Sequence, residues 1–142
     1  RHSRNYNFDF SDIVDWEHMP LFAPMLQPIL QKVEQLTGKE RFSAIFLANL
    51  PANQNIYPHF DQGEFLEVPS RIHIPIQTNS KVVYRIGGFF IEEDLPNKMD
   101  AQILAKEIHM REGEIWEIDN TSYHSVRNGG STPRWHLILN IW

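Results

Sequence analysis

The sequence predicts a mostly β protein, a β-sandwich or barrel with a helical buttress at its N-terminus. Apolar residues recur at clear helical spacing in one stretch, which lies within residues 1–40. From Arg41 onward, short apolar segments follow one another at regular intervals and are separated by turn residues, as in all-β sandwiches and barrels. The length of 142 residues fits a single domain with a substantial core.

Composition supports a folded domain and narrows the classes of function. Apolar residues make up 42% of the chain, with four Trp and nine Phe, which argues against disorder. The absence of cysteine excludes disulfides, a cysteine nucleophile and a cysteine-ligated metal. The net charge of -5 argues against nucleic acid as a partner. No apolar run is long enough to span a bilayer and no signal peptide is visible, so we expect no membrane partner and take the cytoplasm as the default location.

The predicted helix ends at Gly38, because glycine commonly terminates helices. Pro24 and Pro28 are expected near its start, where a missing backbone N–H is tolerated. Its apolar residues at helical spacing are Leu26, Leu30, Val33 and Leu36.

The remaining chain reads as a series of short strands. Strands are predicted at residues 42–50, 71–77, 81–91, 113–119, 123–127 and 134–142. Residues 101–109 fit no single pattern. Gly87-Gly88 predicts a bulge or a close backbone approach, and Tyr84 or Arg85 of the same strand could contact a substrate, although a surface position is preferred. Asn128-Gly129-Gly130-Ser131 predicts that the last two strands form a hairpin.

Two of the predicted strands carry Arg and His on one face. Arg71 and His73 alternate with isoleucines, and Arg134 and His136 alternate with the apolar residues of the last strand. Such a face can line a polar cavity or meet solvent, and the pattern alone leaves both interpretations open. Arginine is the side chain best shaped to clamp a carboxylate through two hydrogen bonds, so a cavity of this kind would suit an acidic ligand.

His59-Phe60-Asp61 is a candidate for metal binding. In an extended segment His59 and Asp61 point to the same side, so both can reach one metal. With a distant second histidine, such as His124 at the start of a later strand, they would form the two-imidazole, one-carboxylate set of non-haem Fe(II) enzymes. The pair by itself is also expected by chance in a chain with this many His and Asp residues, and a simple turn would explain it equally well.

Taken together, these segments resemble the aspartyl/asparaginyl β-hydroxylase family of 2-oxoglutarate/Fe(II)-dependent oxygenases. The similarity runs from Phe42 to Trp142 and is carried by Leu50-Pro51-Ala52 to Pro58-His59-Phe60-Asp61, by Arg71-Ile72-His73-Ile74-Pro75, and by Gly113 through His124 to Arg134-Trp135-His136. The resemblance implies one oxygenase domain over residues 1–142, helical in 1–40 and a double-stranded β-helix (a cupin-like jelly roll) in 41–142.

The resemblance also assigns roles to the polar residues. It implies that His59, Asp61 and His124 hold Fe(II), and that Arg134 pairs with the far carboxylate of the co-substrate 2-oxoglutarate. Arg71 and His73 match residues that line the co-substrate pocket, and His136 shares the strand face of Arg134 and is expected to bind co-substrate with them.

The activity implied by the resemblance is hydroxylation of an amino acid or amino-acid-like substrate by O₂, with release of succinate and CO₂. Some family members lack the carboxylate of the triad, whereas Asp61 is present here, as in members that act on free amino acids. A small molecule is therefore favoured as the substrate, with a peptidyl side chain as the second possibility. Two alternatives stay open: a cupin-like metal-binding protein or isomerase without oxygenase activity, and a β-sandwich without metal. Arg134, ten residues after His124, favours the oxygenase.

Overall fold

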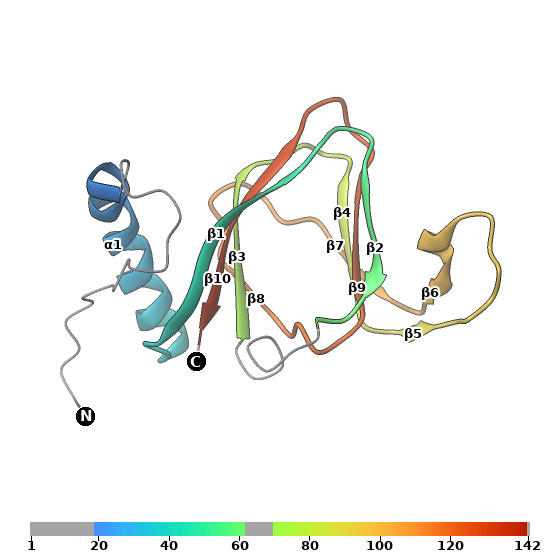
Figure 1. The fold of residues 1–142 in the computed structure, drawn as a ribbon, viewed down its shortest axis with the longest axis horizontal. Coiled ribbons are helices and arrows are strands. Elements are labelled where there is room, and N and C mark those ends of the chain that lie inside the picture. The colour runs from blue at the N-terminus through green and yellow to red at the C-terminus, as the bar shows by residue number, and fades with distance from the viewer. Residues whose placement is uncertain (1–18, 62–69, 142) are drawn as a thin grey trace. The chain divides into compact units, whose positions relative to one another are not determined.

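The computed structural model describes residues 19–61 and 70–141, except for the side chains of residues 19–23 and 43. The chain divides into two compact units, residues 1–41 and residues 42–142. The first unit contains the helix and the second contains the strands (Figure 1). Within the described ranges, no helix is long and apolar enough to cross a membrane.

The helix α1 spans Met19–Thr37 and ends where the sequence predicts. Gly38 takes a left-handed conformation at φ +70, and its N–H donates to the carbonyl of Glu34 at 2.8 Å, which terminates the helix. The start of the helix is earlier than predicted, so Pro24 and Pro28 lie inside it rather than in its first turn. Each proline therefore removes one backbone donor from the helix. Of the apolar positions, Leu30 and Val33 are buried, whereas Leu36 is exposed.

The second unit confirms the prediction of a mostly β protein. The first sheet has the order β1 (Phe42–Leu50), β10 (Arg134–Ile141), β3 (Ser70–Gln77) and β8 (Trp116–Ile118). The second sheet has the order β2 (Asn55–His59), β9 (His124–Asn128), β4 (Val82–Ile86) and β7 (Lys106–Ile108). All neighbouring strands are antiparallel. The two sheets face each other across an interior (Figure 1).

The apolar core lies between the two sheets. It joins residues of the first sheet to residues of the second, and its buried members are Leu50, Val82, Tyr84, Met110, Ile118 and Val126. Strand alternation places the strand residues among them inward, and Met110 follows β7. The polar side chains of β3 and β10 lie beside this core in the same interior, and they belong to the candidate site.

The predicted hairpin between the last two strands is wrong. β9 pairs with β2 and β4, whereas β10 pairs with β1 and β3, so the chain crosses from one sheet to the other between them. The buried side chain of Asn128 explains the difference: its amide donates to the carbonyls of Pro51 and Thr132, and its oxygen accepts from Gly130 and Asn79. These bonds to neighbouring loops hold the Gly-Gly segment as a crossing connection.

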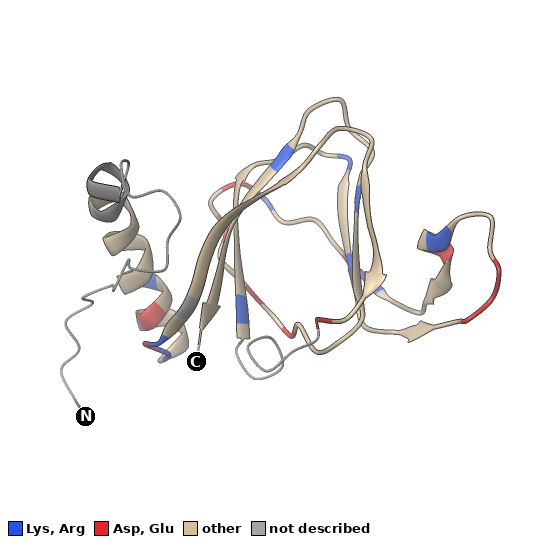
Figure 2. Ribbon diagram, in the orientation of Figure 1, with Lys and Arg blue, Asp and Glu red and all other residues tan. Residues whose placement is uncertain are grey.

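The predicted strand at 81–91 is interrupted after Ile86 by two glycines. Gly87 and Gly88 both have φ +75, and beyond them the chain forms an insertion, residues 87–105, with β5 (Phe89–Phe90), a 3₁₀ helix (Lys98–Ala101) and β6 (Gln102–Ile103). A Cβ at Gly88 would collide with the carbonyl oxygen of Ile103, so the predicted close backbone approach is confirmed. The insertion lies on the outer side of the second sheet, and its acidic loop around residues 92–94 is the part farthest from the strands (Figure 2).

Candidate metal centre and anion pocket

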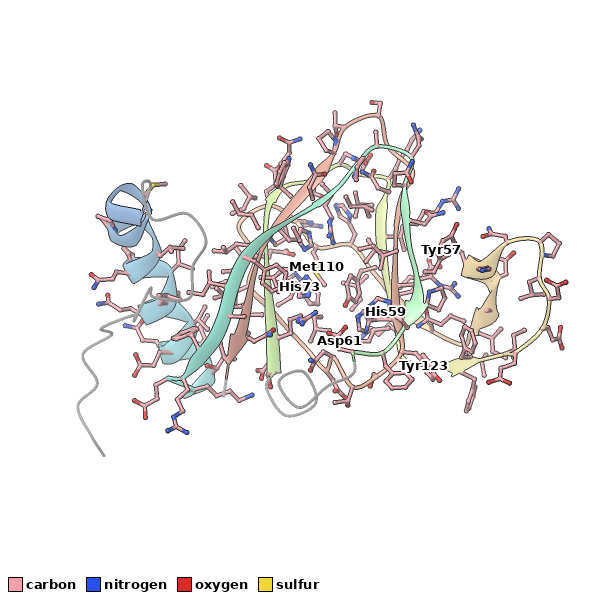
Figure 3. The ribbon with its side chains drawn as sticks, in the orientation of Figure 1. Tyr57, His59, Asp61, His73, Met110 and Tyr123 are labelled. Atoms are coloured by element: carbon pink, nitrogen blue, oxygen red, sulfur yellow. The ribbon has the colours of Figure 1, made fainter. Side chains whose placement is uncertain are left out.

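The structure brings His59, Asp61 and His124 together. One ligand atom from each lies within 4.8 Å of the others. His59 ends β2 and His124 begins β9, and the two are direct cross-strand partners. Asp61 follows β2, and its backbone N–H donates to the carbonyl of Asn120 at 3.1 Å, which continues the pairing beyond the strand. His59 and Asp61 lie at this end of the second sheet, and His73 lies between the sheets (Figure 3).

Hydrogen bonds to carbonyls fix which ring nitrogens of the two histidines are free. Nδ1 of His59 contacts the carbonyl of Tyr57 at 2.7 Å, and Nδ1 of His124 contacts the carbonyl of Ser122 at 2.9 Å. A carbonyl only accepts, so each Nδ1 carries the hydrogen, and in the neutral ring Nε2 keeps its lone pair. Both Nε2 atoms face Oδ1 of Asp61, at 3.5 Å and 3.8 Å. This arrangement could hold a divalent metal between two imidazoles and one carboxylate.

The three groups perturb one another electrostatically. The hydrogen bond to Asp61 raises the pKa of His59, whereas burial lowers the pKa of His124. Burial alone would raise the pKa of Asp61, but the hydrogen bond from His59 and the charge of Arg71 together lower it. Asp61 is therefore ionised at neutral pH and suited to bind a cation.

Arg71 stays a predicted co-substrate residue, and in the structure its side chain contacts Asp61. Its Nη1 lies 2.6 Å from Oδ2 of Asp61, an ion pair whose angles fall outside those of a regular hydrogen bond. Its Nε donates to the buried side-chain oxygen of Asn140 at 3.0 Å, and its guanidinium lies 5.8 Å above the ring centre of Phe46. Asn140 is six residues from Arg134 along β10, so Arg71 of β3 lies beside the opposite end of β10 from Arg134.

Deeper in the interior, Arg134, His136 and His73 form a second polar cluster. All three side chains are buried, so the interpretation that Arg134 and His136 face solvent is wrong. Nδ1 of His73 lies 3.1 Å from Nδ1 of His136, and Nη1 of Arg134 lies 3.5 Å from the same atom of His136. Burial lowers the pKa of His73 well below its ordinary range, that of His136 to about 3, and that of Arg134 to about 10.

This cluster has polar atoms that the described chain does not satisfy. Nε of Arg134, Nε2 of His73 and Nε2 of His136 are buried without a hydrogen-bond partner. Among residues 19–61 and 70–141, no carboxylate pairs with Arg134. A buried cation without an anion is costly, and the interior of a native protein rarely leaves three such atoms unpaired. The cluster is therefore suited to receive an anionic ligand, which we call the anion pocket.

Tyr84 connects the two clusters and was not predicted in this position. Its ring stacks on His124 with centroids 6.0 Å apart and meets the edge of His73 at 5.7 Å. Only 3% of Tyr84 is exposed, whereas its neighbour Arg85 turns outward and donates to the carbonyls of Met99 and Gln102. Strand alternation could have predicted this difference, because Val82, Tyr84 and Ile86 share one face of β4 and Arg85 lies on the other.

Aromatic rings flank the metal centre on its outer side. Tyr123 meets Phe60 edge-on at 5.2 Å and stacks with Phe90 of the insertion at 5.6 Å. Phe60 and Phe90 are each about two-fifths exposed, at 39%. Nothing in the sequence pattern joined these three residues, because Phe90 meets Tyr123 only through the fold of the insertion.

The fold and site define a β-sheet protein with a His–Asp–His cluster beside a buried anion pocket. The sequence profile of the family described as aspartyl/asparaginyl beta-hydroxylase matches residues 14–142. The chain therefore belongs to this family of 2-oxoglutarate oxygenase-like proteins, as its sequence motifs predicted.

Known proteins that are similar to the chain include a hydroxylase and a monooxygenase. L-proline cis-4-hydroxylase of Rhizobium meliloti (strain 1021) is 30% identical over 136 residues, which cover 92% of this chain and 42% of that protein. The solved structure of a non-heme monooxygenase, the ThoJ–Ni complex, superposes with a TM-score of 0.51 at 16% identity, over 80% of this chain and 49% of that one. The chain thus spans less than half the length of each of these two proteins.

Proposed function

We propose that this protein is a non-haem Fe(II), 2-oxoglutarate-dependent dioxygenase that hydroxylates an amino acid or an amino-acid-like substrate. The observation that carries the proposal is the presence, in one interior, of the His–Asp–His cluster and of a buried Arg134 that lacks a carboxylate among the described residues. Membership of the hydroxylase family and the similarity to an L-proline hydroxylase support the type of reaction.

The residues of the metal centre fit Fe(II). Two imidazole nitrogens and one carboxylate oxygen are the donor set of non-haem Fe(II) oxygenases, and they leave three octahedral positions open. His59 and His124 offer Nε2, because their Nδ1 atoms are already engaged by carbonyls, and Asp61 offers Oδ1. Fe(II) bound there would supply oxidation of a substrate C–H bond by O₂, with 2-oxoglutarate converted to succinate and CO₂ as the co-substrate.

The residues of the anion pocket fit the far carboxylate of 2-oxoglutarate. Arg134 would pair with this carboxylate in a buried site, where the interaction is strong and the uncompensated charge of the arginine is neutralised. Nε2 of His136 and Nε2 of His73 would contact the same ligand, since both lack a partner within the described chain. The buried ring of Tyr84 contacts both His73 and His124 and would help to keep water out of this interior.

The proposed substrate is an amino acid in free form, with a peptidyl side chain as the second possibility. The relative named L-proline cis-4-hydroxylase supports a free amino acid, because its name specifies one.

We also infer that residues 41–142 form a double-stranded β-helix. The chain passes repeatedly between two antiparallel four-stranded sheets, ordered β1-β10-β3-β8 and β2-β9-β4-β7, so sequence neighbours are distributed between the sheets. The likeness to the solved structure of a non-heme monooxygenase supports this fold.

An anaerobic titration with Fe(II) and 2-oxoglutarate tests the proposal. A weak visible charge-transfer band is expected only when both are present, and it should disappear in His124→Ala and in Arg134→Ala. Arg127→Ala, which removes an exposed arginine of β9, is the matched control and should retain the band. Fe(II) binding without a band would indicate a cupin-like metal protein instead, and no binding of Fe(II) by the wild-type protein would refute the metal centre itself.

A further inference from the structure

We propose that Gln102 is a positioning residue for His124, because its side chain holds the chain on both sides of this metal ligand. The inference rests on the proposed function, since it assumes that His124 binds a metal. Gln102 belongs to the insertion, on the outer side of the second sheet, so it acts on His124 through β9 and not by contact with the metal (Figure 1). No pattern in the sequence assigned it a role.

The side-chain amide of Gln102 is buried and is hydrogen-bonded at both ends. Its Nε2 donates to the carbonyl of Gly87 at 2.8 Å and to the carbonyl of Tyr123 at 3.1 Å, and its Oε1 accepts from the hydroxyl of Ser125 at 2.6 Å. Since the two carbonyls only accept, the amide has one orientation, with its nitrogen toward them and its oxygen toward the hydroxyl. One planar group thus bonds the residues before and after His124.

These bonds meet β9 at the point where His124 enters the strand. Strand alternation directs the imidazole of His124 into the interior and the side chain of Ser125 to the outer face. Ser125 is fully buried there, with its hydroxyl bonded to Gln102. Nδ1 of His124 is held by the carbonyl of Ser122 at 2.9 Å, so the direction of Nε2 depends on the path of the backbone through residues 122–125. Release of this segment would let Nε2 turn away from the other two metal ligands.

Gln102 is itself fixed by two neighbours. Arg85 of β4 donates from Nη2 to the carbonyl of Gln102 at 2.7 Å and from Nη1 to the carbonyl of Met99 at 3.0 Å. Phe90, the cross-strand partner of Gln102, stacks on the ring of Tyr123 with centroids 5.6 Å apart, where the insertion meets the second sheet (Figure 3). The amide of Gln102 is therefore presented to β9 by a held segment of the chain, which a positioning role requires.

Binding of Ni(II) to the untagged, metal-free protein, measured by calorimetry, tests the role without turnover. Ni(II) binds nitrogen and oxygen donors more tightly than Fe(II), so weakened sites stay measurable. Gln102→Met should weaken Ni(II) binding by about tenfold. Ser125→Ala removes one of the bonds, should weaken binding by a smaller factor, and carries the test if Gln102→Met does not fold. Asn97→Ala, which removes the N-cap of the 3₁₀ helix in the same insertion, is the matched control and should bind Ni(II) as wild type does. Wild-type affinity in both Gln102→Met and Ser125→Ala would overturn the proposal.

A double-mutant cycle separates positioning of His124 from a general loosening of the sheet. In a His124→Ala background, Gln102→Met should change the affinity for Ni(II) by less than about twofold, because the ligand on which Gln102 acts is gone. An equal loss in both backgrounds would show that Gln102 only stabilises the fold, and the proposal would fail while the metal centre stands. If the wild-type protein bound no Ni(II) at all, the proposed metal centre itself would be refuted, and this inference with it.

Discussion

Replacing Arg134 by methionine should stabilise the ligand-free protein. Burial lowers the pKa of Arg134 from its ordinary value to about 10, which means that the charged guanidinium is less stable in the folded chain than in the unfolded chain. Since a tenfold change in a protonation equilibrium is worth about 1.4 kcal/mol, this difference corresponds to a cost of about 3 kcal/mol. The sign follows from the direction: the cost is fully present below about pH 10 and disappears as the pH rises from there through the ordinary pKa of arginine.

The expected net effect is smaller than this cost. Methionine keeps most of the apolar stem of Arg134 in the core, but it loses the contact of Nη1 with His136, which is worth about 1 kcal/mol. We therefore expect Arg134→Met to raise the free energy of unfolding by about 2 kcal/mol at neutral pH. Urea denaturation of the metal-free protein measures this change, and Arg127→Met, at an exposed position of β9, should stay within about 0.5 kcal/mol of wild type.

Addition of metal and 2-oxoglutarate should make the wild-type protein more stable than Arg134→Met. With metal and 2-oxoglutarate at about 100 times its dissociation constant, the wild-type protein gains about 2.7 kcal/mol, whereas Arg134→Met gains little because its anion pocket has lost the cation. A variant that is less stable than wild type by more than about 1 kcal/mol without ligand would refute the reasoning, since the charge of Arg134 would then already be compensated in the folded protein.

Three further predictions concern the metal centre, the anion pocket and the insertion. Because the hydrogen bond to Asp61 raises the pKa of His59, protons should compete with Mn(II) on acidification from about pH 8 to about pH 6, and a constant Mn(II) affinity over this range would contradict the assignment. The Nδ1 atoms of His73 and His136 lie 3.1 Å apart and share one proton between two neutral rings, so one of the two Nε2 atoms carries no hydrogen. Binding of 2-oxoglutarate should therefore take up about one proton in the wild-type protein and none in His73→Gln, as measured by calorimetry in buffers of different ionisation enthalpy. No proton uptake by the wild-type protein would count against this contact. Gly88→Ala should lower the free energy of unfolding by at least about 2 kcal/mol more than Gly87→Ala. Both glycines have φ +75, but only a Cβ at Gly88 would meet a backbone carbonyl. Equal losses in chemical denaturation would show that the close approach does not matter.

The sequence was most informative where the functional residues lie close together in the chain. His59 and Asp61 share one side of an extended segment by strand alternation alone, and Arg134 and His136 do the same on the last strand. The family motifs then added His124, which the structure places directly across from His59. These predictions needed only local geometry and a resemblance, so errors in strand pairing did not affect them.

The sequence was least informative where strand pairing decides the contacts. The ion pair of Arg71 with Asp61 depends on β3 and β2 belonging to opposite sheets, which no local pattern states. The hairpin prediction failed because the Gly-Gly turn is a local signal, whereas the side chain of Asn128 is bonded to loops far away in the sequence. The buried position of Tyr84 could have been read from alternation, but the preference for a surface strand outweighed it.

The two sheets divide the site between them. His59 and His124 stand on paired strands of the second sheet, whereas Arg71, His73, Arg134 and His136 all stand on paired strands of the first. A molecule that binds the metal at one end and Arg134 at the other would therefore bridge the two sheets. Its affinity would depend on the distance between the two sheets. A substitution in the apolar core that the sheets share could therefore change co-substrate binding without altering the metal ligands.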